Sequence, residues 1–420
     1  MPAASGSGLV HIQSLDELEC RRRENKELRQ KNEVLESLLL QLQRSPGQAQ
    51  RNAVIDAVLD VEVPTIMGPG RLWAPEQAIG GAPCPNRPAP STTEHATDRL
   101  LTSSYDRTAK LWCAQTGACL QTFMGHTDAV MYAVFAPGGR SVLTAGNDGL
   151  AKIWSIETGE CITTLDGRQG TFSSPHMQAQ SNAQFHGLFT AVFSADGSRV
   201  LTSSADGGAR IWRVADSTCE WAVQGHNAYM RMAVFSPSET HVMTASADHT
   251  AKLWCIKTKI CEMILVGHEG CVNTAVFSDD SRLVLTSSAD STARLWSART
   301  HRTVGDFFGH HHNVRSAVFA MPGYVLTCSA DRSVKLWSMV LCTCEQTFRG
   351  HDCWVNSAVA SSAGALILTA SRDHTAKLWR TNTGECELTI GTLWAEHASQ
   401  AQGGHVDIVT SASFAPAYKP

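Results

Sequence analysis

Short runs of apolar and β-branched residues, separated by segments rich in Gly, Pro, Ser and Asp, recur through residues 99–415 of this chain. One copy contains MRMAVFS from Met230, HVMTAS from His241, TAKLW ending at Trp254, and CEMILV from Cys261. Each run has the length of a strand, and turn-forming segments such as SPSE and ADHT separate neighbouring runs. The pattern therefore predicts four short antiparallel strands in a full copy.

The third predicted strand of every copy ends in tryptophan, and an aspartate stands six residues earlier. The copies read YDRTAKLW, NDGLAKIW, ADGGARIW, ADHTAKLW, ADSTARLW, ADRSVKLW and RDHTAKLW, and their tryptophans are Trp112, Trp154, Trp212, Trp254, Trp296, Trp337 and Trp379. Successive tryptophans are 41 or 42 residues apart, except for one interval of 58 residues. A period of about 40 to 45 residues is typical of four-stranded propeller blades, so the seven copies predict an all-β, seven-bladed propeller.

A Gly-His pair precedes the first predicted strand of most copies, and the pairs are Gly125-His126, Gly225-His226, Gly267-His268, Gly309-His310, Gly350-His351 and Gly404-His405. With the tryptophan phrases, these pairs resemble the WD-repeat propeller family over about three-quarters of the chain. In that family the His bonds the turn Asp, and a strand Ser or Thr links the His to the Trp indole. The resemblance thus implies a buried network of His226, Asp248 and Trp254, completed by Thr244 or Ser246.

The same resemblance implies equivalent networks in other blades, made by His126, Asp148, Trp154, His268, Asp290, Trp296, His310, Asp331, Trp337, His351, Asp373, Trp379, His405, Asp106 and Trp112. The chain departs from the family in lacking the Asp that follows each Trp, a residue that varies in such repeats. It also reads Gly167-Arg168 where the third blade's Gly-His pair belongs, so we expect that network to be incomplete. A Lys or Arg stands two residues before every Trp, and we expect it to extend along its blade toward solvent.

The two ends of the repeat array are incomplete in complementary ways. RLLTSS precedes Trp112 without a first strand before it, whereas IVTSASFAP follows His405 and ends the repeats. We therefore expect Val409 to Phe414 to supply the first strand of the blade that contains Trp112. This clasp closes the ring and removes the sheet edges that an open ring would expose.

Residues 12–44 carry a leucine heptad pattern, which predicts a helix that dimerises as a parallel coiled coil. Asn25 and Asn32 occupy a positions, which favours a parallel, in-register pair. The leucines expected in the dimer interface are Leu28, Leu35, Leu39 and Leu42. A lone amphipathic helix, or one packed on another protein, is the alternative. The segment resembles the zipper of basic leucine-zipper factors, but no basic helix precedes it. Residues 45–98 are rich in Pro and Gly, and we expect them to form a linker before the propeller at 99–415.

Composition narrows the expected partners and location. The net charge of −4 argues against a nucleic-acid surface, and no apolar run is long enough to cross a bilayer. The first residues, MPAASGSGLVHIQ, do not follow the layout of a secretory signal, so we expect a cytoplasmic or nuclear protein. Outside the repeated network we find no nucleophile–base pair, phosphate-binding loop or metal quartet. We therefore expect no catalytic residue, no cofactor and no metal. The run His310-His311-His312 could suggest a metal site, but its first histidine already belongs to the network.

Function is expected where copies differ. Insertions at 168–186 and 392–402 lie between a fourth strand and the next first strand. The resemblance implies that both lie on the face of the Asp-bearing turns, and each is either a binding loop or a tolerated insertion. We hypothesise a partner patch on that face, built from turn residues, one insertion residue and residues before first strands: Tyr105, Arg107, Asn147, Arg372, His374, Trp394, Tyr229 and Trp354. The predicted function is a noncatalytic scaffold or adaptor that recruits proteins to the propeller rim. The alternative is a substrate receptor of a ubiquitin ligase, based on the weak motif LWSAR from Leu295 to Arg299.

Overall fold

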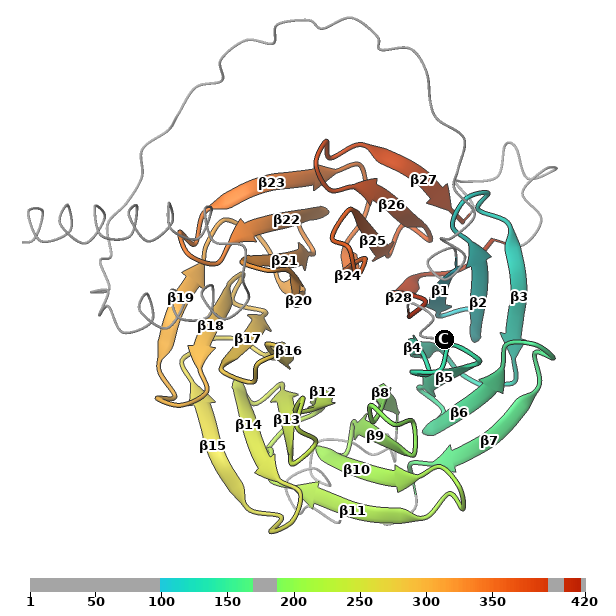
Figure 1. Cartoon of the computed structure of the whole chain (residues 1–420), viewed down its shortest axis with the longest axis horizontal. Helices are drawn as coiled ribbons and strands as arrows, with labels where there is room; N and C mark the ends of the chain where they lie inside the picture. Colours follow the sequence, from blue (N-terminus) through green and yellow to red (C-terminus); the bar gives the residue numbers. More distant parts are fainter. Residues whose placement is uncertain (1–98, 169–186, 392–403, 417–420) are drawn as a thin grey trace, which may run out of the picture. The chain divides into compact units, whose positions relative to one another are not determined.

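The computed structural model describes residues 99–168, 187–391 and 404–416. Within them, the strands form seven antiparallel sheets of four strands each, arranged as blades around one axis (Figure 1). The predicted all-β, seven-bladed propeller is therefore confirmed. The expected coiled coil at 12–44, the linker at 45–98 and Trp394 lie outside the described residues, as do all but the first residue of the 168–186 insertion.

Blades are numbered along the chain, and each is given from its innermost to its outermost strand. Blade 1 consists of β28 (Val409–Phe414), β1 (Arg99–Ser104), β2 (Thr108–Cys113) and β3 (Cys119–Met124). Blade 2 consists of β4 (Val130–Phe135), β5 (Ser141–Gly146), β6 (Leu150–Ser155) and β7 (Cys161–Asp166). Blade 3 consists of β8 (Leu188–Phe193), β9 (Arg199–Ser204), β10 (Gly208–Arg213) and β11 (Cys219–Gln224). The next two are blade 4, β12 (Met230–Phe235), β13 (His241–Ser246), β14 (Thr250–Cys255) and β15 (Cys261–Val266); and blade 5, β16 (Val272–Phe277), β17 (Leu283–Ser288), β18 (Ala293–Ser297) and β19 (Thr303–Phe307). The last two are blade 6, β20 (Val314–Met321), β21 (Tyr324–Ser329), β22 (Ser333–Ser338) and β23 (Cys344–Arg349); and blade 7, β24 (Val355–Ala360), β25 (Leu366–Ser371), β26 (Ala376–Arg380) and β27 (Cys386–Ile390).

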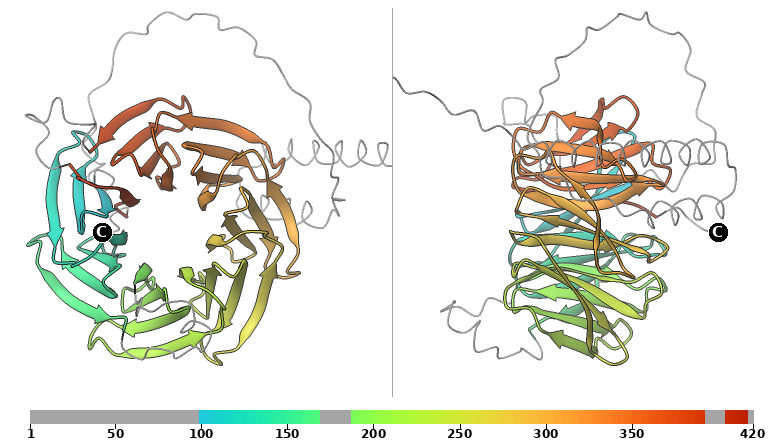
Figure 2. Two further views of the ribbon diagram at one scale, coloured as in Figure 1. Left: turned by 180° about the vertical axis from the view of Figure 1, so that it is seen from behind. Right: turned by 90° about the vertical axis from the view of Figure 1, so that its left-hand side faces the viewer.

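Burial falls from the inner strands to the outer ones. In the second strand β17 every residue is buried, because neighbouring blades cover both faces of the sheet (Figure 2). In the outermost strand β15, Ile264 and Val266 are exposed while Met263 and Leu265 are buried, so only one face packs on a neighbour. The core is thus a series of apolar layers between blades, each repeated with the period of the sequence.

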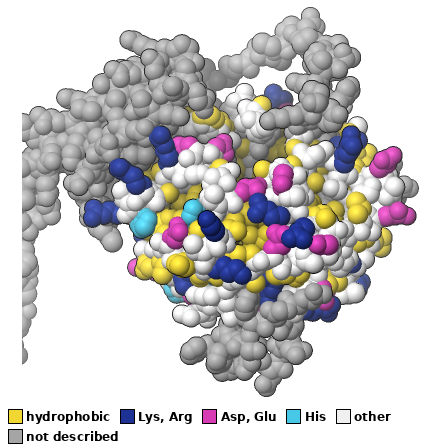
Figure 3. All heavy atoms as spheres, turned by 60° about the horizontal axis from the view of Figure 1, so that its bottom comes forward, with side chains coloured by type: hydrophobic (Ala, Val, Ile, Leu, Met, Phe, Trp, Pro, Cys, Tyr) yellow, Lys and Arg dark blue, Asp and Glu magenta, His cyan; other side chains and the backbone are white. Residues whose placement is uncertain are grey.

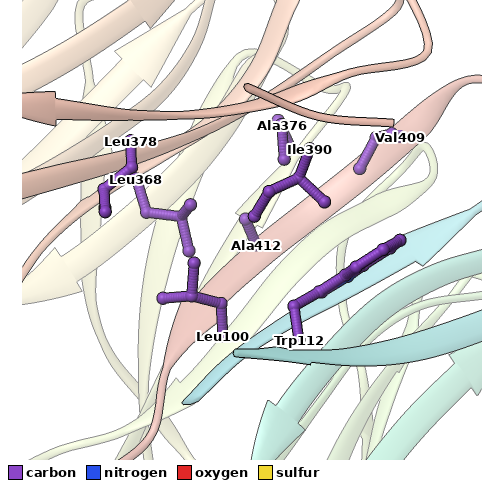
Figure 4. Close-up of a cluster of buried hydrophobic side chains, with 9 residues drawn as sticks. Leu100, Trp112, Leu368, Ala376, Leu378, Ile390, Val409 and Ala412 are labelled. Atoms are coloured by element: carbon purple, nitrogen blue, oxygen red, sulfur yellow. The ribbon is translucent and has the colours of Figure 1, made fainter. Parts of the chain in front are cut away.

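The ring closes between blades 7 and 1. Strand β28 pairs antiparallel with β1, as the complementary ends of the repeat array predicted. Figure 4 shows Val409 and Ala412 of β28 in the layer between Trp112 of blade 1 and the apolar side chains of blade 7. These residues are nearly inaccessible to solvent, so the last strand fills a place in the core.

Hydrogen bonds from β28 reach both neighbouring blades. The Thr410 hydroxyl donates to the Val130 carbonyl of blade 2 at 2.7 Å, and the Ser411 hydroxyl accepts from the backbone N–H of Ala133. On the other side, the Asn356 amide of blade 7 donates to the Val409 carbonyl at 2.9 Å. Removing β28 would leave these buried polar groups without partners as well as opening the apolar layer.

Candidate functional site

Each network links the face of the Asp-bearing turns, called here the turn face, to the interior of its blade. In blade 1, Nδ1 of His405 lies 2.7 Å from the Asp106 carboxylate, and Nε2 lies 2.8 Å from the Thr102 hydroxyl. The indole N–H of Trp112 donates to the same hydroxyl at 2.7 Å. Because the carboxylate only accepts hydrogen bonds, the neutral imidazole carries its proton on Nδ1 and receives the hydroxyl proton at Nε2.

Blades 2, 4, 5, 6 and 7 repeat this arrangement. In blade 4, the hydroxyl that joins His226 to Trp254 belongs to Thr244, at 2.8 and 2.9 Å. Ser246, the other expected candidate, instead accepts from the backbone N–H of Asp248 and donates to the Tyr229 carbonyl. The threonines in the remaining four blades are Thr144, Thr286, Thr327 and Thr369.

The glycine of the Gly-His pair is required by close packing. Gly350 has a φ of 142°, which side chains rarely adopt, and a Cβ there would lie 3.3 Å from Cη2 of Trp379. Gly125 and Gly309 have the same conformation against Trp154 and Trp337. The pair is therefore a structural unit. The glycine leaves room for the indole ring, and the histidine forms a hydrogen bond with the Asp of the turn.

The electrostatics of the networks favour the ionised form of Asp106 and the neutral form of three histidines. Burial by itself raises the pKa of Asp106, but hydrogen bonds from His405 and Thr108 outweigh it and lower the pKa to about 2. Burial lowers the pKa of His405, of His226 and of His310. A neutral imidazole held between an acceptor and a hydroxyl deep in a blade is a structural element with no access to a substrate.

Blade 3 builds its network with a cation where the other blades have a histidine. No histidine bonds Asp206 among the described residues; instead Nη2 of Arg210 lies 2.6 Å from its carboxylate, and Trp212 still donates to Thr202 at 3.0 Å. The Arg210 side chain is only 1% exposed, so the prediction of a solvent-facing cation is wrong at this position. Among the described residues, Arg210 thus takes the place of histidine as the side-chain partner of the Asp206 carboxylate. Arg168, which stands in place of the histidine in sequence, bonds Asp166 on the surface.

The partner-patch candidates occupy two kinds of position beside the network. Arg372 precedes the network Asp of its turn, and its backbone N–H donates to the Trp354 carbonyl at 2.8 Å, so the fold brings these two candidates together. Tyr105 and Tyr229 hold the corresponding turn and pre-strand positions in blades 1 and 4, where both are about two-fifths exposed. Asn147 is turned toward Asp128, to which its amide donates at 2.7 Å.

Arg107 and His374 follow the network Asp, in a conformation that is unusual for their residue types. Both have a φ of 69°, in the left-handed region, and blades 2 and 3 place Gly149 and Gly207 at the same turn position. A non-glycine residue there carries backbone strain of the order of 1 kcal/mol. Both residues lie in the Asp-bearing turns and therefore on the turn face.

A repeated β-bulge supplies residues that sequence reasoning missed. In every blade the second residue of the first strand is skipped in the pairing with the second strand, as at Arg231 between Met230 and Met232. The skipped residues are Met131, Phe189, Arg231, Asn273, Arg315, Asn356 and Thr410. Bulges re-aim side chains, and here they do so on the innermost strands, next to the propeller axis (Figure 1).

Two of these bulge residues are cations packed on aromatic rings. The Cζ atom of Arg315 lies 5.5 Å from the ring centroid of Trp354, and that of Arg372 lies 4.7 Å from the same centroid. In blades 3 and 4, Arg231 lies 5.4 Å from the ring of Phe189, which also contacts Tyr229. We call Tyr105, Phe189, Tyr229, Arg231, Arg315, Trp354 and Arg372 the axial cluster.

The charges of the axial cluster act on one another across blades. Burial lowers the pKa of Arg315, and the positive charges of Arg231 in blade 4 and Arg372 in blade 7 lower it further. Tyr105 of blade 1 also lies close enough to act on it. The axial cluster is thus drawn from blades 1, 3, 4, 6 and 7. Arg231 and Arg315 could have been found in the sequence, because the second residue of the first strand is a cation in these two blades and neutral in the other five.

Metal-ligating residues gather at a different place. Within the described residues, one group of such side chains brings its ligand atoms within 4.8 Å of one another, and it consists of His241, Cys255 and Glu262 on the side of blade 4. Nε2 of His241 is engaged with the Glu262 carboxylate at 2.9 Å. His311 and His312, by contrast, are exposed, and only their backbone atoms enter the bonds around Asp331 and Ser329.

Radial four-stranded blades, each locked by a buried network that ends at a turn, define a propeller of the WD-repeat class. The family described as "WD domain, G-beta repeat" matches 117–155, 181–213, 217–255, 259–297, 301–338 and 342–380. These matches cover more than half of the chain, and the chain belongs to this family. Its propellers are usually noncatalytic and generally bind proteins.

Similarity to a curated protein extends over a short stretch. A "Lissencephaly-1 homolog" of Branchiostoma floridae is 36% identical over 74 residues, which are 16% of this chain and 16% of that relative. The match therefore spans far less than two thirds of the relative's length. No helix in the described part of the chain is long and apolar enough to cross a membrane.

Proposed function

We propose that this chain is a noncatalytic interaction scaffold that binds partner proteins on its turn face, at the axial cluster. The observation that carries the proposal is the exposure of large aromatic residues there. Tyr105, Tyr229 and Trp354 are 40–42% exposed, although each follows or precedes a strand whose core residues are fully buried. Aromatic and arginine side chains are the residues that most often anchor protein interfaces.

The networks under the axial cluster favour such a role. The backbone N–H of Arg372 bonds the Trp354 carbonyl, while the next residue, Asp373, is held by His351 at 2.7 Å. Side chains that stand on rigid, hydrogen-bonded turns lose little conformational entropy when a partner binds. The repeated interior thus positions an exposed surface that differs from blade to blade.

Affinity purification of the tagged full-length chain tests this proposal. We expect Trp354→Ala to remove at least one partner protein that Arg299→Ala retains. Arg299 is a suitable control because it is exposed and lies beyond β18, at the opposite end of that strand from the turn of Asp290. The opposite result, with a ligase adaptor lost from Arg299→Ala alone, would instead support the substrate-receptor alternative.

The N-terminal segment adds a second part to the proposal: residues 12–44 dimerise the chain in parallel, through a linker at 45–98, so that two propellers at 99–415 act together. The leucine and asparagine pattern of the sequence supports it. Light scattering should give twice the chain mass for the full-length protein and the single mass for the variant Leu28→Glu, Leu35→Glu. A single mass for both proteins would remove dimerisation from the proposal.

A further inference from the structure

We propose that the axial cluster binds an oxyanion, a carboxylate or a phosphoryl group, carried by a segment of a partner protein, with Arg231, Arg315 and Arg372 as its ligands. This inference rests on the proposed function and names the chemistry of the same surface. It follows from three observations: the arginines lack carboxylate partners within the described residues, the rings hold them in place, and the face shown in Figure 3 is of mixed charge.

The three guanidinium groups are not neutralised within the described residues. No carboxylate there lies within ion-pair distance of Arg231, Arg315 or Arg372, whereas Arg199 and Arg210 are each paired with an acidic residue. Nε of Arg231 is moreover buried without a hydrogen-bond partner in the same part of the chain. Like charges gathered without counter-charge cost free energy, and an anionic ligand removes that cost.

The aromatic rings hold the arginines in place. Trp354 contacts two guanidinium groups, those of Arg315 and Arg372, and Phe189 contacts that of Arg231. A cation–π contact engages the face of a guanidinium group and leaves its N–H edge free to donate. Arg315 uses one edge nitrogen for Asn356 at 3.4 Å, a long hydrogen bond that a charged acceptor can outcompete.

The size and setting of the cluster favour a protein segment over a nucleic acid. A nucleic-acid site needs cations spread along a phosphate backbone, whereas these three are confined to two innermost strands, β12 and β20, and one turn of blade 7. Elsewhere, acidic and basic side chains are interspersed with apolar ones on the face shown in Figure 3, and the chain carries a net charge of −4. Exposed Tyr105 and Tyr229 offer apolar contacts to residues that flank the anion.

Fluorescence anisotropy with the full-length chain tests the inference. The probes are labelled peptides of one Gly/Ser-rich sequence whose central pair is phosphoserine, glutamate or serine, together with a single-stranded oligonucleotide. We expect both anionic peptides to bind more tightly than the serine peptide, and Arg315→Gln to weaken that binding about tenfold or more. Arg315→Lys should recover part of the affinity, and Arg299→Gln should leave it unchanged. Tighter binding of the phosphoserine peptide assigns a phosphoryl ligand; equal or tighter binding of the glutamate peptide assigns a carboxylate.

Several outcomes would overturn the inference: equal affinity for the serine peptide, insensitivity to Arg315→Gln at an unchanged melting temperature, or tighter binding of the oligonucleotide than of either peptide. Its failure can be told apart from failure of the scaffold proposal. A captured partner that is lost from Trp354→Ala but bound normally by Arg315→Gln keeps the scaffold and rejects the oxyanion. A partner retained by both variants rejects the scaffold proposal itself.

Discussion

Asp373 and Arg372 are adjacent in one turn, yet they belong to two different regions of the turn face. Asp373 lies in the network layer, where His351 and Thr375 bond its carboxylate and where five other blades also have a His–Asp pair. Arg372 lies in the axial cluster, exposed and stacked near Trp354, at a position that holds alanine in four blades. The difference shows that a buried, fully bonded position must repeat to keep each blade folded, whereas an exposed position beside it is free to differ.

The largest expected effect comes from opening the ring. Deleting residues 404–420 removes β28, the histidine of the blade 1 network and Val409 from the layer shown in Figure 4. We expect the melting temperature to fall by about 10 °C or more, because several kcal/mol of burial and hydrogen bonding are lost. A chain that ends at residue 416 keeps β28 and is the control. An unchanged melting temperature for the longer deletion would contradict the clasp.

Blade 3 allows the network layer to be tested at its one exception. Arg210→Ala leaves the Asp206 carboxylate, about one-tenth exposed, without its cation. Breaking a buried pair typically costs about 3–5 kcal/mol, and we expect a loss in that range by urea denaturation. Lys252→Ala is the matched control at the same position of blade 4, where the ammonium bonds a backbone carbonyl; its loss should stay below about 1 kcal/mol. Equal losses would mean that Arg210 does not replace the histidine.

Substitutions of Asp373 and Arg372, the adjacent pair in blade 7, should differ by a smaller amount in the free energy of unfolding. Asp373→Ala leaves His351 and two backbone N–H groups without their acceptor, so we expect a loss of about 2–3 kcal/mol in the free energy of unfolding. Arg372→Ala removes an exposed side chain and should change it by less than about 0.5 kcal/mol. If Arg372→Ala proved as destabilising as Asp373→Ala, the division into two regions would fail.

Acid should weaken the network layer in two pH windows. Burial lowers the pKa of His226, His310 and His405 below the ordinary value of 6.5, so the unfolded chain binds protons that the folded chain does not. The contribution of these histidines to the free energy of unfolding is therefore fully present above pH about 6.5 and decreases as the pH falls below it. Asp106, with a pKa of about 2 when folded, adds a further loss between pH about 4 and 2. A melting temperature that stayed constant from pH 7.5 to 5.5 would contradict the neutral-histidine assignment.

The smallest expected effect has the opposite sign. Arg107→Gly should raise the free energy of unfolding slightly, by up to about 1 kcal/mol, since glycine adopts a φ of 69° without strain. Blades 2 and 3 already place glycine at this turn position. Ser291→Gly in blade 5 is the matched control and should show a similar gain. A loss of stability from Arg107→Gly alone would show that its side chain supports the turn.

Much of the fold was predictable from sequence because its signals are local. The Trp phrases and Gly-His pairs each fit within one blade, so their period specified the blades, and the unmatched halves at Trp112 and His405 specified the clasp. The same locality explains what was missed. Arg210 bonds the Asp206 carboxylate in the tertiary structure, but in the sequence it resembles every other Lys or Arg that stands two residues before a Trp.

By itself, then, the sequence determined the number of blades, the closure of the ring and the residue types of its networks, since each depends on short-range patterns repeated along the chain. Only the tertiary structure decided which of the residues that differ between blades lie close together. Arg231, Arg315 and Arg372 come from three blades and are far apart in sequence. They influence one another because two of them stand at bulges on innermost strands and the closed ring brings those strands around one axis.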